Sequence, residues 1–166
     1  EYEAALRSVT FEVLGNNPST ATRTIEFQVN DGTGDSNAQS RDVTVASVND
    51  DPYNNGSLPG TITVAEDTLS DVDLSAIDLS DVDAGSSDLT VTLSTSTGGL
   101  LSAISGGGVT VGGSGTGVLT LTGAIVDLDS YLDSVSNIQY VHGTTHTFGD
   151  NADTITVVVN DNGNTG

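Results

Sequence analysis

The chain has 166 residues, of which 23 are acidic and only 3 are basic, so its formal net charge is −20. A charge of this sign and size excludes partners that are held by phosphate neutralisation, such as nucleic acid, and also excludes binding to anionic membrane surfaces. Cysteine is absent, which excludes disulfides and cysteine nucleophiles, and no apolar run is long enough to span a membrane.

The apolar residues form short alternating runs, which a disordered acidic chain would not need. Clusters of Gly, Asn and Asp separate these runs, a pattern typical of an all-β antiparallel sandwich. The run at 157–159 does not alternate, which predicts a central strand covered on both faces. Strands are predicted near residues 42–48, 61–65, 89–94, 108–112, 118–122, 138–142 and 153–159.

One segment departs from the strand pattern. Leu128, Leu132 and Val135 recur at helical spacing, which predicts one or two helical turns that lay these side chains on the end of the sandwich. Asp127 is the expected N-cap of this helix. A second short helix is predicted at the start of the chain from Tyr2, Leu6 and Val9.

The sequence contains an internal repeat with a period near 130 residues. The matching blocks are 2–11 with 131–140, and 24–31 with 154–161. We therefore predict that residues 1–49 are the C-terminal part of one repeat and that residues 50–166 are the next repeat without its closing strand. The segment 42–48 supplies that strand in the first copy, and we expect the chain to be an internal piece of a longer protein.

Acidic residues gather where the predicted strands end. They occur at the junction 49–51, at 66–67, through 71–83, and at the equivalent strand ends Asp31 and Asp161. Hard oxygen donors at short spacing suit Ca²⁺, which takes six to eight oxygen ligands in flexible geometry. The alternative is a solvated acidic surface that keeps the protein soluble.

The spacing within 81–83 adds a geometric expectation. If this segment is extended, Asp81 and Asp83 lie on one side of it and Val82 turns inward. Several carboxylates a few Å apart repel one another strongly, so we predict that a cation joins them.

Nothing in the sequence predicts catalysis. His142 and His146 have a spacing that would bind zinc on a helix, but Gly143 and the neighbouring threonines predict a surface loop, with metal binding as the alternative. No serine lies in a Gly-x-Ser-x-Gly elbow, and the glycine-rich stretch 112–117 lacks the lysine of a phosphate loop. We therefore predict that the protein is not an enzyme.

Several segments together resemble the cadherin-like or Ig-like tandem repeats of giant bacterial surface adhesins. The resemblance implies calcium-dependent Greek-key sandwiches, in which acids at the junction bind calcium between neighbouring repeats. One departure is Asp51, where a small apolar residue is commoner, and another is the length of the repeat. The segments that carry the resemblance are 2–11, 22–37 and 43–52, with 79–85 and 112–123 as weaker matches. The calcium ligands that it implies are Asn49, Asp50, Glu66, Asp67, Asp81 and Asp83, to which the strand ends add Asp31 and Asp161.

The leading hypothesis is a calcium-rigidified structural spacer of a secreted adhesin or fibre at the bacterial cell surface. Its expected partners are neighbouring repeats of the same chain and, by strand complementation, other copies arranged head to tail. The alternative is a calcium-dependent carbohydrate-binding module. Such a module stacks sugars on aromatic side chains, and Tyr53 and Phe148 are the aromatic residues outside the expected core positions.

Overall fold

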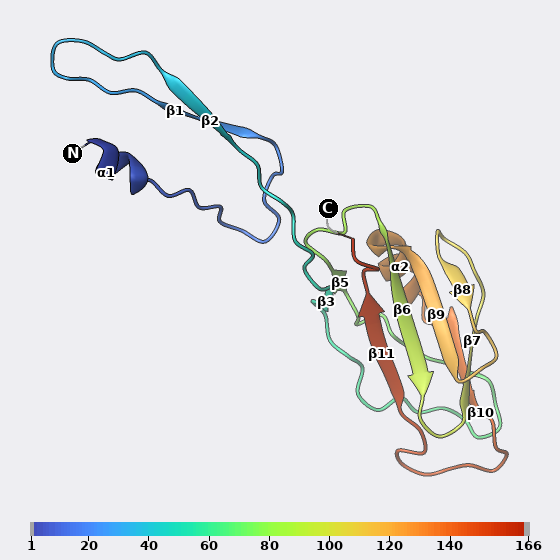
Figure 1. The fold of residues 1–166 in the computed structure, drawn as a ribbon. Coiled ribbons are helices and arrows are strands. Elements are labelled where there is room, and N and C mark those ends of the chain that lie inside the picture. Colours follow the sequence, from blue (N-terminus) through green and yellow to red (C-terminus); the bar gives the residue numbers. More distant parts are fainter. Residues whose placement is uncertain (1, 165–166) are drawn as a thin grey trace. The chain divides into compact units, whose positions relative to one another are not determined.

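The computed structural model describes residues 2–164, and it is mostly β, with antiparallel sheets and two short helices (Figure 1). The chain divides into two compact units, unit 1 at Glu1–Val48 and unit 2 at Asn49–Gly166, and each is described by itself. Within the described part of the chain, no helix is long and apolar enough to cross a membrane.

Unit 1 consists of one helix and one pair of strands. Helix α1 spans Tyr2–Arg7, which confirms the predicted helix at the start of the chain. Strand β1 (Arg23–Phe27) pairs antiparallel with β2 (Gln39–Val43). No side chain of residues 3–48 is buried. A strand pair without a buried face is only marginally stable in water.

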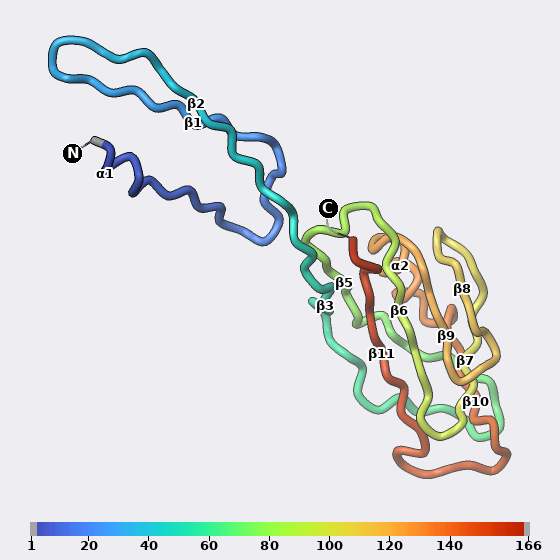
Figure 2. The backbone as a smooth tube through the Cα atoms, viewed as in Figure 1, coloured from blue at the N-terminus to red at the C-terminus, as the bar shows by residue number. Residues whose placement is uncertain are grey.

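Unit 2 contains two main sheets, whose course is clear in the backbone trace (Figure 2). The larger sheet has the order β11-β6-β9-β8 and the smaller has the order β4-β10-β7, while β3 and β5 form a short further pair. Every neighbouring pair is antiparallel. The strands are β3 (Tyr53–Asn54), β4 (Ser70–Asp71), β5 (Leu79–Ser80), β6 (Asp88–Thr95), β7 (Gly99–Ala103), β8 (Thr110–Gly112), β9 (Val118–Ala124), β10 (Ile138–His142) and β11 (Ile155–Asn160).

The two sheets share one core. In β6 the buried residues Leu89, Val91 and Leu93 alternate with half-buried threonines, as expected for a strand with one face turned inward. The same alternation recurs in β9. The core cluster also contains residues from the smaller sheet and from the second helix, namely Leu101, Ala103, Ile138, Tyr140, Leu128, Tyr131 and Leu132.

The second helix, α2, spans Ile125–Leu132 and confirms the predicted helical segment. The predicted cap at Asp127 is wrong, because β9 runs directly into the helix and the N-cap position falls on Ala124. Val135 lies beyond the end of the helix and is exposed. Tyr131 is buried in its place, and its hydroxyl donates a hydrogen bond to the carbonyl of Ile104 at 2.8 Å.

Most of the predicted strands exist, but four details differ. No strand forms at 61–65, and the predicted strand at 42–48 is represented by β2, which ends at Val43. The prediction that 157–159 lie in a central strand is wrong, because β11 is the edge of its sheet and its residues alternate between half-buried and exposed. Strand β7 was not predicted, because it begins at Gly99 and a glycine pair such as Gly98 and Gly99 is typical of a turn.

Candidate metal centre

Three carboxylates from two separate loops meet in unit 2. Asp81 and Asp83 lie in the loop after β5, and Asp161 directly follows the C-terminal end of β11. One carboxylate oxygen from each of the three residues lies within 4.8 Å of those from the other two. Asp83 is 1% exposed and Asp161 is 5% exposed, and among residues 2–164 they are the charged side chains that are buried. Burial of a charge is costly unless a partner compensates it.

One oxygen of each carboxylate is held by a backbone amide. Oδ1 of Asp81 accepts a hydrogen bond from the N–H of Asp83 at 2.9 Å, and Oδ1 of Asp161 accepts one from Gly163 at 3.1 Å. Oδ2 of Asp83 accepts a hydrogen bond from the N–H of Asp50, also at 2.9 Å. These amides therefore fix the direction of all three side chains. One of the amides, that of Asp50, belongs to the first residues of unit 2.

The second oxygen of each carboxylate has no donor. Oδ2 of Asp81, Oδ1 of Asp83 and Oδ2 of Asp161 are buried without a hydrogen-bond partner, and the same holds for Oδ1 of Asn49. Leaving a buried acceptor unsatisfied costs about 1–3 kcal/mol, and more when the group is charged. A cation bound among these oxygens would remove that cost. A donor set made only of carboxylate and amide oxygens suits Ca²⁺.

The pKa values of Asp81 and Asp83 move in opposite directions. Burial raises the pKa of Asp81, but the amides of Asp83 and Ala84 more than offset this, so that its pKa is lowered. The hydrogen bond from Asp50 lowers the pKa of Asp83, yet burial and the adjacent Asp81 carboxylate outweigh it, so that its pKa is raised. The site thus favours positive charge next to Asp83, whether from a proton or from a metal ion.

The prediction that Val82 turns inward is wrong. Val82 is 43% exposed, whereas Asp83 is almost completely buried. The segment is not extended, because the N–H groups of Asp83 and Ala84 both donate to Oδ1 of Asp81 and close a turn. This turn directs the carboxylates, rather than the valine, toward the interior.

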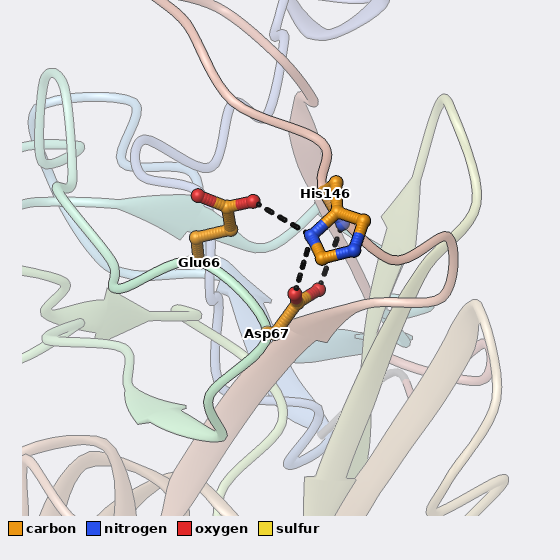
Figure 3. Close-up of side chains that lie close together, drawn as sticks. All are labelled: Glu66, Asp67 and His146. Carbon is orange, nitrogen blue, oxygen red and sulfur yellow. Dashed lines mark hydrogen bonds and ion pairs between the residues drawn. The ribbon is translucent and has the colours of Figure 1, made fainter.

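Glu66 and Asp67, which were predicted to join this cluster, lie beside His146 instead (Figure 3). Nδ1 of His146 is 3.3 Å from Oε1 of Glu66 and 3.2 Å from Oδ2 of Asp67. The backbone N–H of His146 also donates to Oδ1 of Asp67 at 2.9 Å. His146 belongs to the loop before β11, whereas Asp161 follows that strand, so β11 separates the two clusters along the chain.

The cluster of Glu66, Asp67 and His146 differs from the buried one in a decisive way. All three side chains are exposed, and the imidazole Nδ1 can donate its proton to either carboxylate. Water and the ring therefore satisfy these carboxylates without a metal ion. The buried cluster has neither source of donors, which makes it the candidate metal centre.

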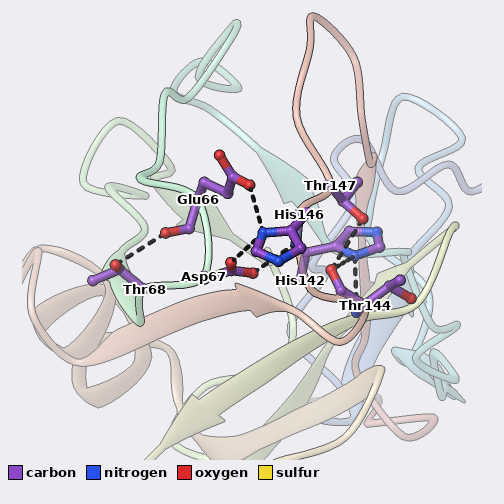
Figure 4. Close-up of polar contacts among 7 residues, drawn as sticks. All are labelled: Glu66, Asp67, Thr68, His142, Thr144, His146 and Thr147. Carbon is purple, nitrogen blue, oxygen red and sulfur yellow. Dashed lines mark hydrogen bonds and ion pairs between the residues drawn. The ribbon is translucent and has the colours of Figure 1, made fainter.

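His142 takes no part in either cluster. It is the last residue of β10, and its Nδ1 accepts a hydrogen bond from the backbone N–H of Thr144 at 3.1 Å (Figure 4). His142 is half-buried and His146 is exposed, and residues 143–154 form a loop without a helix or strand. The helical His-x-x-x-His geometry of a zinc site is therefore not present.

A further predicted ligand is Asp31. Asp31 is in unit 1, where Oδ1 accepts hydrogen bonds from the amides of Thr33 and Gly34 and from the Thr33 hydroxyl. The Thr33 hydroxyl, followed by these amides, lowers the pKa of Asp31 to about 2. Asp51 is exposed. Asp31 thus repeats the turn of Asp161, but among the described residues it belongs to no group of three or more His or acidic side chains that could hold a metal ion.

Sequence reasoning missed two features of these sites. It did not place His146 beside Glu66 and Asp67, because the two loops are far apart in sequence. It also did not foresee that the Asp50 amide, rather than the Asp50 carboxylate, would contact Asp83. In comparisons with known proteins, no family model, no curated protein and no solved structure matched the chain.

Proposed function

We propose that the cluster of Asp81, Asp83 and Asp161, together with Asn49, binds Ca²⁺. The observation that carries this proposal is the set of four buried oxygens without donors. They supply part of the six to eight oxygens that Ca²⁺ takes, and water or backbone carbonyls would supply the rest. Mg²⁺ fits less well, because it requires strict octahedral geometry and retains most of its water.

The wider role that we propose is a calcium-rigidified structural spacer of an extracellular bacterial adhesin or surface fibre. Two antiparallel sheets with one shared core support a Greek-key Ig-like or cadherin-like sandwich for unit 2. The proposed ligands come from the first residue of unit 2 and from the loops after β5 and β11. An ion held by all of them would restrain the chain where it enters unit 2 from Val48.

The alternative, a calcium-dependent carbohydrate-binding module, has less support. Tyr53 and Phe148 are both exposed, as a stacking platform would require. However, the near-complete burial of Asp83 and Asp161 favours an ion that is enclosed by the protein rather than one open to sugar hydroxyls. A glycan array distinguishes the two roles, because a spacer should give no signal.

Isothermal titration calorimetry tests the calcium site directly. We expect saturable Ca²⁺ binding by the native chain and its loss in Asp83→Asn, which keeps the size of the side chain but removes its charge. Asp51→Asn is the matched control, since it removes one exposed charge from the adjacent junction. Equal Ca²⁺ affinity in Asp83→Asn and in the native chain would refute the site.

A further inference from the structure

The dipeptide Asn-Gly occurs twice in the sequence, at 55–56 and at 162–163. A glycine after asparagine has no side chain to hinder attack of its backbone nitrogen on the asparagine carboxamide. This attack joins the glycine nitrogen to Cγ and expels ammonia, which leaves a five-membered succinimide. Water then opens the ring at either carbonyl and gives aspartate or isoaspartate. The whole conversion consumes one water and releases one ammonia, and it needs no enzyme or oxidant.

The pair at 162–163 forms a turn directly after Asp161. Asn162 and Gly163 have left-handed φ angles of 61° and 78°, and the N–H of Asn164 donates to the carbonyl of Asp161 at 3.3 Å. Asn-Gly is the preferred pair for turns with two left-handed residues. Both residues are exposed, and a Cβ placed on Gly163 would meet no atom within 4 Å. The turn therefore has room to rearrange.

Only contacts of individual side chains hold the reacting groups of this turn. Nδ2 of Asn162 donates to the carbonyl of Asp88 at 2.9 Å and lies 3.4 Å from the hydroxyl of Thr90, which is 3.5 Å from Oδ1. The N–H of Gly163 donates to Oδ1 of Asp161 at 3.1 Å. Each of these bonds involves the side chain of Asn162 or Asp161, so they can open without separating a pair of strands.

The pair at 55–56 is also exposed, but its backbone is held in place. The N–H of Asn55 donates to the carbonyl of Asp78 at 2.7 Å, and the N–H of Gly56 donates to Oδ1 of Asn54 at 3.0 Å. The same Oδ1 accepts the N–H of Asp78 at 2.9 Å. A Cβ on Gly56 would collide with the carbonyl oxygen of Ala76. The Gly56 nitrogen therefore cannot turn toward the Asn55 carboxamide unless β3 separates from β5.

We propose that Asn162 is a site of spontaneous deamidation and that isoaspartate at this position disables the calcium centre. The modification follows from the turn alone, whereas its effect on calcium rests on the proposed function. Isoaspartate takes the main chain through the former side chain, which adds one carbon between residue 162 and Gly163. This displaces the Gly163 N–H from Oδ1 of Asp161, the bond that fixes this carboxylate.

The lost carboxamide has a second effect on the same carboxylate. Nδ2 of Asn162 ties the turn to the carbonyl of Asp88 at the start of β6, and a carboxylate in its place has no proton to donate. Asp161 would therefore lose both its own amide donor and the anchor of its turn. Since Oδ2 of Asp161 is one of the proposed calcium ligands, the calcium centre has a finite chemical lifetime.

Peptide mass spectrometry of the aged chain compares the two pairs within one molecule. The native chain is incubated in Ca²⁺ at mildly alkaline pH, with circular dichroism to verify that its strands persist, and a parallel sample is incubated in urea. After proteolysis, the mass increase of deamidation and the methyl label added by an isoaspartyl methyltransferase measure the conversion at each asparagine. We expect Asn162 to convert at least tenfold faster than Asn55 in the folded chain and at a similar rate in urea. Equal rates in the folded chain, or faster conversion of Asn55, would overturn the modification site.

Isothermal titration calorimetry of the same samples, after removal of Ca²⁺, tests the effect on the calcium centre. We expect the Ca²⁺ bound per chain to fall in proportion to the isoaspartate at position 162. Asn162→Gly is the matched control, because glycine adopts the left-handed φ and has no carboxamide, so its Ca²⁺ binding should not change with age. Full Ca²⁺ binding by a chain converted at position 162 would overturn the link to the calcium centre. A fresh native chain that binds no Ca²⁺ would instead refute the proposed function, and the rate comparison would still decide whether Asn162 is the modification site.

Discussion

The backbone N–H of Asp50 donates a hydrogen bond to Oδ2 of Asp83 at 2.9 Å, and this contact ties the first residues of unit 2 to the loop after β5. The bond uses the oxygen of Asp83 that faces the junction and leaves Oδ1 buried without a donor. The same carboxylate therefore holds the entry of the chain and offers a ligand to an ion. This double role explains why we expect the stability of unit 2 and the behaviour of the junction to respond together to calcium.

The first prediction concerns thermal stability. Because the proposed site exists only in the folded chain, Ca²⁺ at 100 times its dissociation constant adds about 2.7 kcal/mol to the free energy of unfolding. We expect the melting temperature, followed by circular dichroism, to rise with Ca²⁺ and to fall after chelation. Asp161→Asn should abolish this response while Asp51→Asn should keep it. A melt that does not change after exhaustive chelation would contradict the calcium assignment.

The second prediction concerns the junction. The double variant Asp81→Asn, Asp83→Asn removes two charges without changing side-chain size. We expect small-angle scattering in Ca²⁺ to show a wider distribution of distances between the two units for this variant than for the native chain. Circular dichroism should show that the variant keeps its strands. If the variant scatters like the native chain in Ca²⁺, these two residues do not restrain the junction.

The sequence predicted the strands with clear alternation, because burial of one face is a local pattern. Strands β6 and β9 are examples, since buried Leu and Val alternate there with Thr. Strand β7 escaped prediction because Gly99 has a packing role: a Cβ at this position would collide with the ring of Tyr140 and with the Asp153 carboxylate. The alternation at 61–65 was visible, but a strand also needs a neighbour to pair with.

The sequence placed some of the site residues together, but not all of them. Asp81 and Asp83 are close in sequence, and Asp161 was found through the repeat. Glu66 and Asp67 carry the same kind of side chain as these residues and also lie near a predicted strand end, yet they face His146. Which loops meet is decided by the pairing of strands far apart in sequence, and the acid pattern contains no information about that pairing.

The third prediction concerns the exposed cluster. His146→Ala removes the imidazole between Glu66 and Asp67, and exposed ion pairs of this kind contribute about 0–1 kcal/mol. We expect urea denaturation to show a loss of no more than about 1 kcal/mol, and the calcium response should be unchanged. His142→Ala, at the end of β10, is the control. A loss of Ca²⁺ binding in His146→Ala would show that this cluster, and not the buried one, holds the ion.

The fourth prediction concerns Asp153, whose carboxylate fastens the turn between β6 and β7. Oδ1 accepts hydrogen bonds from the amides of Ser96, Thr97 and Thr154, and Oδ2 accepts one from Gly99. Burial raises the pKa of Asp153, but the hydroxyl of Ser96 and these amides outweigh it and hold the pKa well below its ordinary value.

A lowered pKa means that the folded chain binds the Asp153 proton less readily than the unfolded chain. The stability that Asp153 contributes is therefore complete above about pH 4, the ordinary pKa of Asp, and is lost as the pH falls below it. Asp153→Asn should cost about 2 kcal/mol or more at pH 7, because an amide presents a donor to groups that are themselves donors. The difference between native and variant in urea denaturation should shrink between pH 4 and pH 2. A constant difference would show that the charge of Asp153 is not responsible.

The fifth prediction concerns Tyr140, whose hydroxyl donates a hydrogen bond to Oδ2 of Asp153 at 3.0 Å. Burial, together with the hydrogen bond and the negative charge of Asp153, raises the pKa of Tyr140 to about 12. The folded chain thus retains the phenol proton at a pH where the unfolded chain, with an ordinary pKa near 10, loses it. The stability contributed by this proton is complete below about pH 10 and declines as the pH rises toward 12.

Tyr140→Phe should cost about 1–2 kcal/mol at pH 7 through the lost hydrogen bond to a charged acceptor. In urea denaturation between pH 9 and pH 12, the native chain should lose its advantage over Tyr140→Phe. If the two chains instead keep the same separation across this range, the phenol of Tyr140 does not titrate differently in the folded and unfolded states.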